Sequence, residues 1–278
     1  MLRVPCLLLL ILLVTACGRD QAPAPSSAPL AGADQGAAAT PGGATTDLSD
    51  VIENDRRYLV GISYPRGIDA HPGLAAALKR YADGTRADLM QAVEELGDTP
   101  PTSPYDLSLA FTTLTDSPRV VAVAADGSSY TGGAHGNPLV ARFVWLPERA
   151  SMLRAEALVG EAAGWRAVSA FVREQLHAAL SQRIDADELE PTERAQLMRS
   201  AGRLIDEGSE PEAANFSEFE PMVARDGRLS GLRFVFPPYQ VGPYSDGLHT
   251  VEVPASVLLP HVAPAYRDLF VAGPGPGA

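Results

Sequence analysis

A glycine-rich loop between two predicted strands constrains this chain more than any other stretch. The loop spans residues 130–138, reads Tyr-Thr-Gly-Gly-Ala-His-Gly-Asn-Pro, and holds three glycines within five positions. Residues 120–125 before it are apolar and partly β-branched, while Leu139, Ala141, Phe143 and Trp145 after it share one face of a strand. Glycine allows positive φ and close backbone approach. The pattern predicts strand, loop and strand, with the loop either a tight connection or part of a binding surface.

A second distinctive stretch, residues 236–247, precedes a predicted strand at 249–253 that Pro254 ends. Its pattern is Phe-x-Pro-Tyr-x-Val-x-x-Tyr-x-x-Gly. The two loops resemble the signatures of a bacterial envelope family. That family includes the lysozyme-binding domain of the anti-sigma factor RsiV and the non-catalytic N-terminal region of the peptidoglycan deacetylase PdaC. Asn215-Phe216-Ser217 and Tyr64-Pro65 also resemble the family, so the similarity covers most of residues 51–260.

The resemblance implies a binding module whose two loops form one surface against a wall-associated protein, such as a lysozyme, or against peptidoglycan. Tyrosines combine a large contact area with a polar tip, which suits them as anchors. The predicted ligand-binding residues are Tyr130, Gly132, Gly133, His135, Asn137, Pro238, Tyr239 and Tyr244. The chain departs from the family at residues 146–149, which lack the usual Asp and Gly of a tight turn.

The first 17 residues resemble a lipoprotein signal peptide. Arg3 precedes an apolar run at 7–14 that is too short to span a bilayer, and residues 14–17 resemble a lipobox ending at Cys17. We expect lipidation of Cys17 and, because Gly18 follows it, an outer-membrane position facing the periplasm of a Gram-negative cell. The alternative is an ordinary secretory signal cut elsewhere. Cys6 would be removed, so the mature chain would form no internal disulfide.

Residues 18–50 are rich in Ala, Pro, Gly, Ser and Thr and are predicted to form a disordered tether. Such a segment has an r.m.s. length of roughly 30 Å. The rest of the chain is predicted to divide into a PdaC N-terminal-like half at 51–150, an RsiV C-terminal-like half at 151–270 and a disordered tail at 271–278. We expect the two halves to form one compact body.

Hydrophobic periodicity predicts an α+β fold with an antiparallel β-sheet and two long helices packed on one face. Turn residues at 226–228 predict a hairpin between two of the strands. The predicted strands cover residues 58–64, 105–111, 120–125, 139–145, 222–223, 232–236 and 249–253. The predicted helices cover residues 72–96, 161–183 and, shorter, 191–206.

The net charge of −12 argues against nucleic acid as a partner and favours a basic protein. We predict no metal and no cofactor, since the chain has no His-x-x-x-His pattern and no Gly-x-Ser-x-Gly elbow. Its many Asp and Glu leave a glycosidase pair open, and nothing singles one out. The weak catalytic candidates are His135, Asp246 and His249, which would have to converge across the two loops.

Two hypotheses remain. The first is a non-catalytic, lipid-anchored extracytoplasmic binding protein. The alternative is an envelope glycan hydrolase or deacetylase using His135. Contact of His135 with Asp246 or His249 beside an open pocket would favour the enzyme.

Overall fold

The computed structural model describes residues 46–97, 100–186 and 189–271. The predicted signal peptide with Cys17, most of the predicted tether and residues 272–278 of the predicted tail lie outside this part. Within the described ranges, no helix is both long and apolar enough to cross a membrane.

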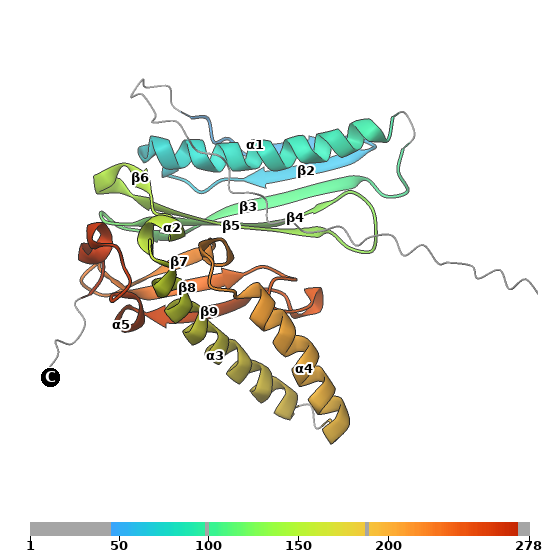
Figure 1. Cartoon of the computed structure of the whole chain (residues 1–278). Helices are drawn as coiled ribbons and strands as arrows, with labels where there is room; N and C mark the ends of the chain where they lie inside the picture. The colour runs from blue at the N-terminus through green and yellow to red at the C-terminus, as the bar shows by residue number, and fades with distance from the viewer. Residues whose placement is uncertain (1–45, 98–99, 187–188, 272–278) are drawn as a thin grey trace, which may run out of the picture. The chain divides into compact units, whose positions relative to one another are not determined.

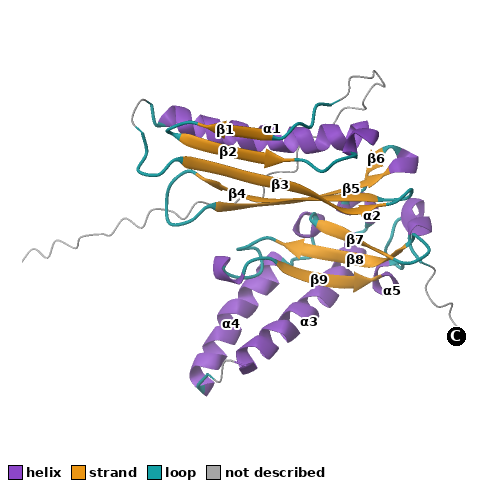
Figure 2. Ribbon diagram, turned by 180° about the vertical axis from the view of Figure 1, so that it is seen from behind, coloured by secondary structure: helices purple, strands orange, loops and turns teal. Residues whose placement is uncertain are grey.

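Six strands form the first sheet, sheet A, in the order β1-β2-β3-β4-β5-β6. They are β1 (Val51–Asn54), β2 (Tyr58–Ser63), β3 (Tyr105–Asp116), β4 (Val121–Tyr130), β5 (Asn137–Leu146) and β6 (Ser151–Met152). Neighbouring strands are antiparallel except β2 and β3, which are parallel. A parallel pair needs a crossover connection, and helix α1 (Pro72–Glu95) supplies it. This helix lies along one face of sheet A (Figures 1 and 2).

Three antiparallel strands form the second sheet, sheet B: β7 (Phe219–Val223), β8 (Leu229–Phe236) and β9 (His249–Pro254). The long helices α3 (Ala162–Ala186) and α4 (Pro191–Gly208) precede it in the chain. Two short helices are α2 (Ala155–Leu158) and α5 (Ala255–Leu258). The 3₁₀ turns are η1 (Ile68–Ala70), η2 (Pro147–Arg149), η3 (Ala213–Phe216), η4 (Tyr244–Asp246) and η5 (Pro264–Leu269).

The described residues form two hydrophobic cores, and strands β4 and β5 contribute to both. Val121, Val123 and Phe143 pack in the core beneath α1. Val144 and the neighbouring Ala122 point the other way, into the core that α3, α5 and sheet B share. Burial on both faces explains why residues 120–125 read as a continuous apolar run rather than an alternating one.

The second core is organised around Phe216 of η3. Its ring stacks on Trp165 of α3 with centroids 5.3 Å apart and meets Phe234 of β8 edge to face, also at 5.3 Å. Aromatic pairs prefer these two arrangements. The residue at the centre of the Asn215-Phe216-Ser217 segment is therefore a packing residue, fully buried between helix and sheet.

The predicted α+β class is confirmed, and the predicted arrangement of one antiparallel sheet with both long helices on one face is corrected. There are two sheets, sheet A is mixed, and α1 packs on sheet A while α3 packs in the core of sheet B. The reason is that apolar periodicity defines which face of a strand is buried but not which element covers it. The predicted boundary between family halves at residue 150 stays a prediction.

The connection after Trp145, where Asp and Gly are missing, is closed by η2 and Ala150. Ala150 has a φ of 46°, the left-handed conformation that glycine adopts most readily. Its N–H donates to the carbonyl of Pro147. The chain therefore forms a tight turn at this position without glycine, and Ala150 adopts a conformation that is strained for a residue with a Cβ.

Arg142 of β5 joins sheet A to sheet B through an ionic network centred on its own buried side chain. Its side chain is 5% exposed, and its Nη1 and Nε donate to Asp126 of β4 and Glu220 of β7, each at 2.8 Å. Arg233 of β8 also donates to Glu220. Since β6 covers only the end of β5, the Arg142 N–H lies at a sheet edge, where Glu218 accepts it. Burial raises the pKa of Glu218, against the lowering effect of that hydrogen bond.

We predict that Arg142→Ala lowers the free energy of unfolding by about 3–5 kcal/mol, because it leaves the Glu220 carboxylate, which is only 15% exposed, with the exposed Arg233 as its remaining cation. Arg233→Ala is the matched control, since its side chain is 42% exposed and touches the same carboxylate. An exposed pair contributes about 0–1 kcal/mol. Urea denaturation of both variants measures the difference, and equal losses would contradict a special role for Arg142.

Candidate functional site

The glycine-rich loop connects β4 and β5 at one end of sheet A, as the sequence predicted. Gly132 and Gly133 have φ values of 102° and 97°, a conformation that disfavours any side chain even though no atom blocks a Cβ at either position. The hydroxyl of Tyr130 donates to the carbonyl of Gly133 at 3.2 Å and closes the loop. The glycines therefore set the path of the backbone, and His135 projects from it as an exposed side chain.

The second loop, residues 237–248, connects β8 to β9 in sheet B and is held by main-chain hydrogen bonds. Tyr239 is one of two non-glycine residues with positive φ in the described part of the chain, at 75°. Its N–H donates to the carbonyl of Gly242 at 3.0 Å, which holds the turn closed. A bulky residue in this conformation marks stored strain and, by itself, only suggests a functional position.

Gln240 anchors this loop to the rest of the protein. Its side-chain nitrogen donates to the carbonyls of Gly208 and Asn215, both at 2.9 Å. Gly208, the last residue of α4, lies so close that a Cβ there would be 1.8 Å from the carbonyl oxygen of Gln240. The anchor holds the residue next to Tyr239 and leaves Tyr239 itself 46% exposed.

The two loops meet through three aromatic rings, which we call the aromatic site: His135, Tyr239 and Tyr244. The rings of His135 and Tyr244 stack with centroids 4.1 Å apart and planes within 13°, and the rings of Tyr239 and Tyr244 lie 5.6 Å apart. The Tyr239 hydroxyl lies 2.8 Å from His135 Nε2. Both ribbon views place the β4–β5 connection and η4 at the same end of the molecule (Figures 1 and 2).

The prediction that the two loops lie side by side is confirmed, while the expectation that they share a single sheet is wrong. The glycine-rich loop belongs to sheet A and the second loop to sheet B. The aromatic site is therefore formed only when the two sheets pack against each other. The predicted ligand-binding role of its residues stays a prediction.

Hydrogen bonds fix the tautomer of the neutral His135 ring. Nδ1 lies 3.0 Å from the carbonyl oxygen of Gly136, which can only accept, so Nδ1 carries the proton. Nε2 is then an acceptor, and the Tyr239 hydroxyl donates to it. Both ring nitrogens are engaged within the protein, so the ring faces and the tyrosine edges are what the aromatic site offers to a ligand.

The other predicted site residues surround these rings. Asn137 begins β5, pairs with Ser129 and is exposed, and Pro238 is partly buried beside Tyr239. Sequence reasoning missed Leu248, an apolar residue that is 44% exposed four positions after Tyr244. It also missed the anchor Gln240, whose only signal was its position inside the second motif. Both are parts of the second loop that the family pattern leaves unspecified.

Asp246 and His249, the weak catalytic candidates, are engaged elsewhere. Asp246 Oδ2 accepts a hydrogen bond from Arg183 of α3 and lies 4.0 Å from His249 Nε2. Burial lowers the pKa of His249, and the positive charge of Arg183 lowers it further against the effect of Asp246. None of the hydrogen bonds or ion pairs among the described residues connects either of them to His135. Nor do the described residues group three or more His, Cys, Asp or Glu as a metal site would.

The fold and the aromatic site define an α+β protein with two packed sheets and an exposed aromatic surface across them. The family model described as "Deacetylase PdaC" matches residues 52–138, and the model described as "Protein of unknown function (DUF3298)" matches residues 166–256. Over these segments the chain is similar to the PdaC-like and DUF3298 families, which confirms the resemblance found in its motifs. The match over residues 52–138 does not show deacetylase activity in this chain.

Two solved structures are similar to this chain. A DUF3298 family protein from Pseudomonas aeruginosa PAO1 has a TM-score of 0.52 and 16% identity, covering 81% of this chain and 94% of that chain. A member of the same family from Bacteroides fragilis NCTC 9343 has a TM-score of 0.49 and 16% identity, covering 79% and 94%. At this identity the Pseudomonas structure supports the fold alone. No curated protein matches the chain.

We predict that neutral His135 is mainly the Nδ1–H tautomer, because Gly136 O accepts from Nδ1 and Tyr239 donates to Nε2. The ¹⁵N chemical shifts of the ring measure this directly. Tyr239→Phe removes the donor and should raise the share of the Nε2–H form. Tyr244→Phe keeps that hydrogen bond and should leave the shifts nearly unchanged. A ring that is mainly Nε2–H in the unaltered protein would contradict the described loop contact.

Proposed function

We propose that the protein is a non-catalytic, extracytoplasmic binding protein whose aromatic site binds a cell-wall-associated protein, such as a lysozyme, or peptidoglycan. The observation that supports this most is the joining of His135, Tyr239 and Tyr244 into one partly exposed surface. Tyrosines that are held rigidly and half exposed lose little freedom on binding and bury a large area. Tyr130 and Asn137 would border the contact.

The contacts of His135 favour binding over catalysis. A general base needs a ring nitrogen within hydrogen-bond distance of the proton it removes. Both nitrogens of His135 are already bonded within the protein, and one partner is a main-chain carbonyl that cannot leave easily. The hydrolase or deacetylase hypothesis required His135 beside Asp246 or His249, and the described contacts do not place it there.

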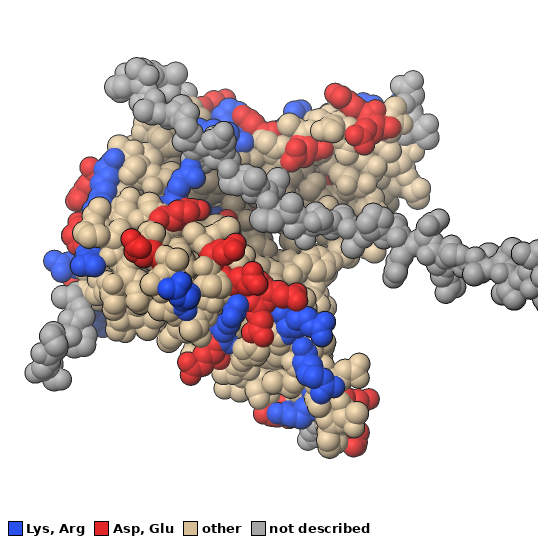
Figure 3. All heavy atoms as spheres, viewed as in Figure 1, with Lys and Arg blue, Asp and Glu red and all other residues tan. Residues whose placement is uncertain are grey.

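The acidic balance of the chain favours a basic protein partner. The net charge is −12, yet acidic and basic side chains are mixed on the face shown in Figure 3, with acidic ones gathered over the C-terminal end of α4. Such a distribution would attract a basic partner over long range, an effect that salt screens. The affinity itself would come from the aromatic contact, since exposed charges mainly change the rate of association.

We further propose that the chain is anchored by a lipid on Cys17 to the outer membrane and faces the periplasm. The lipobox-like residues before Cys17, followed by Gly18, support this. The 18–50 segment would then act as a tether that holds the described body away from the bilayer.

We predict that Tyr239→Ala weakens binding to a basic lysozyme or to peptidoglycan fragments by about 2 kcal/mol or more, as expected for a central anchor. Isothermal titration calorimetry with the purified protein measures the loss. His135→Ala should weaken binding less, through loop geometry alone.

The matched control for Tyr239 is Leu114→Ala. Leu114 is 42% exposed, close to the 46% of Tyr239, and lies near the end of β3 away from the glycine-rich loop. Its truncation should leave affinity unchanged. Absence of binding to both ligands, together with turnover of a wall substrate that His135→Ala abolishes, would replace the binding proposal with the enzyme hypothesis.

We predict that Cys17→Ala blocks lipid modification and releases the protein from the membrane fraction. Cys6→Ala is the control, because Cys6 would lie in the removed signal peptide and its substitution should leave modification intact. Incorporation of labelled fatty acid measures both. A Cys17→Ala protein that still carries lipid would refute the anchoring proposal.

A further inference from the structure

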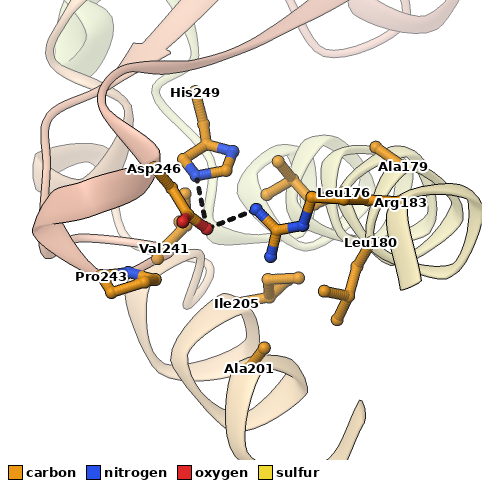
Figure 4. A pocket seen from close by; sticks show the side chains of 11 residues that line it. Leu176, Ala179, Leu180, Arg183, Ala201, Ile205, Val241, Pro243, Asp246 and His249 are labelled. Carbon is orange, nitrogen blue, oxygen red and sulfur yellow. Dashed lines mark hydrogen bonds and ion pairs between the residues drawn. The ribbon is translucent and has the colours of Figure 1, made fainter. Parts of the chain in front are cut away.

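A cavity of about 130 Å³ lies between α3, α4 and the second loop. Its apolar walls come from Leu176 and Leu180 of α3, Ile205 of α4, and Val241 and Pro243 of the loop, whose side chains surround a common space in Figure 4. Pro243 is exposed, so the cavity opens to the surface. Since Val241 and Pro243 lie between Tyr239 and Tyr244 in the chain, the cavity and the aromatic site share one loop.

One side of the cavity is polar and electrically balanced. Arg183 and Asp246 are joined there by a hydrogen bond (Figure 4). The Arg183 side chain is 44% exposed, so its remaining N–H groups can donate to a ligand. Asp246 has a second carboxylate oxygen, whose described partner is the hydroxyl of Ser245 at 3.3 Å. The pair therefore offers a donor and an acceptor side by side with no net charge.

His249 also lines the polar side of the cavity. Its Nε2 is buried and has no hydrogen-bond partner among the described residues. The backbone of Gly242 covers it, because a Cβ on Gly242 would lie 2.7 Å from Nε2. A glycine at this position lets the ring close against the loop, and the cavity keeps its shape.

We propose that the cavity receives one apolar side chain, of leucine or phenylalanine size, from a protein partner, with the peptide group of that residue placed between Arg183 and Asp246. An amide carbonyl accepts from the guanidinium while the amide N–H donates to the carboxylate. A charged ligand group would instead meet one partner of like sign. The inference rests on the proposed function, because it places this partner at the adjoining aromatic site.

The size of the cavity favours a protein side chain over a sugar. A protein cavity of roughly 150 Å³ binds benzene, so a space of about 130 Å³ matches a ring or an isobutyl group. The acetamido group of a wall sugar would also match the amide-binding pair, but its methyl group would fill only part of the apolar space. Unfilled apolar volume loses contact energy, which favours the larger occupant.

The test is an NMR titration of the purified protein with N-acetyl-L-leucinamide, and separately with N-acetylglucosamine, followed by the methyl signals of Leu176, Leu180, Ile205 and Val241. We expect saturable shifts with leucinamide and a dissociation constant on the order of 1–10 mM, typical for a ligand of this size. Ala179 is also exposed but lies in the cavity lining, so Ala179→Leu should narrow the cavity and weaken leucinamide binding by ~10-fold or more. Ala178→Leu, an exposed neighbour outside the cavity lining, should not.

Each other result overturns the inference. Shifts with N-acetylglucosamine but not with leucinamide would assign the cavity to a glycan. No shifts with either compound, or equal effects of the two leucine variants, would show that the cavity is not a binding site. The unaltered protein separates the two failures. Leucinamide shifts without binding of lysozyme or peptidoglycan would contradict the proposed function, whereas lysozyme binding without leucinamide shifts would contradict this inference.

Discussion

The contact between the two sheets is the constraint on which the rest of this structure depends, and Arg142 is its centre. A guanidinium that is 5% exposed is tolerable only because Asp126 and Glu220 neutralise it from opposite sheets. Such a network penalises every relative placement of the sheets that separates these three groups. It therefore adds directional specificity to apolar packing, which is itself non-directional.

The site depends on that placement because it has one half in each sheet. Asp126, which binds Arg142, lies four residues before Tyr130 on β4, and the second loop continues directly from β8, whose Arg233 shares Glu220. The network thus lies on the strands that carry both loops. Within the second loop, Gln240 and the turn at Tyr239 complete the positioning, since they fix the backbone that carries the ring.

Much of this could be predicted from the sequence where local chemistry decides the structure. Gly132 and Gly133 predicted positive φ, and the apolar stripes at helical spacing predicted α1 and α3. Asp226-Gly227 predicted a hairpin. The parallel pairing of β2 with β3, the edge strand β1 and the split into two sheets depend on contacts between distant residues, which periodicity does not encode. Arg142 shows the limit most clearly, because a polar residue in an alternating strand reads as solvent-facing although it is buried.

The roles of the histidines depend on contacts that the sequence does not mark. A histidine in a loop carries no sequence mark of its hydrogen-bond partners, yet those partners decide what it can do. Both ring nitrogens of His135 are hydrogen-bonded within the protein, and one ring face stacks on Tyr244. The ring therefore holds two tyrosines in place. His249 is buried against Gly242 and shapes a cavity wall. Both rings shape the surface around them, and the groups left free to contact the proposed partner are aromatic edges, apolar walls and one balanced ion pair.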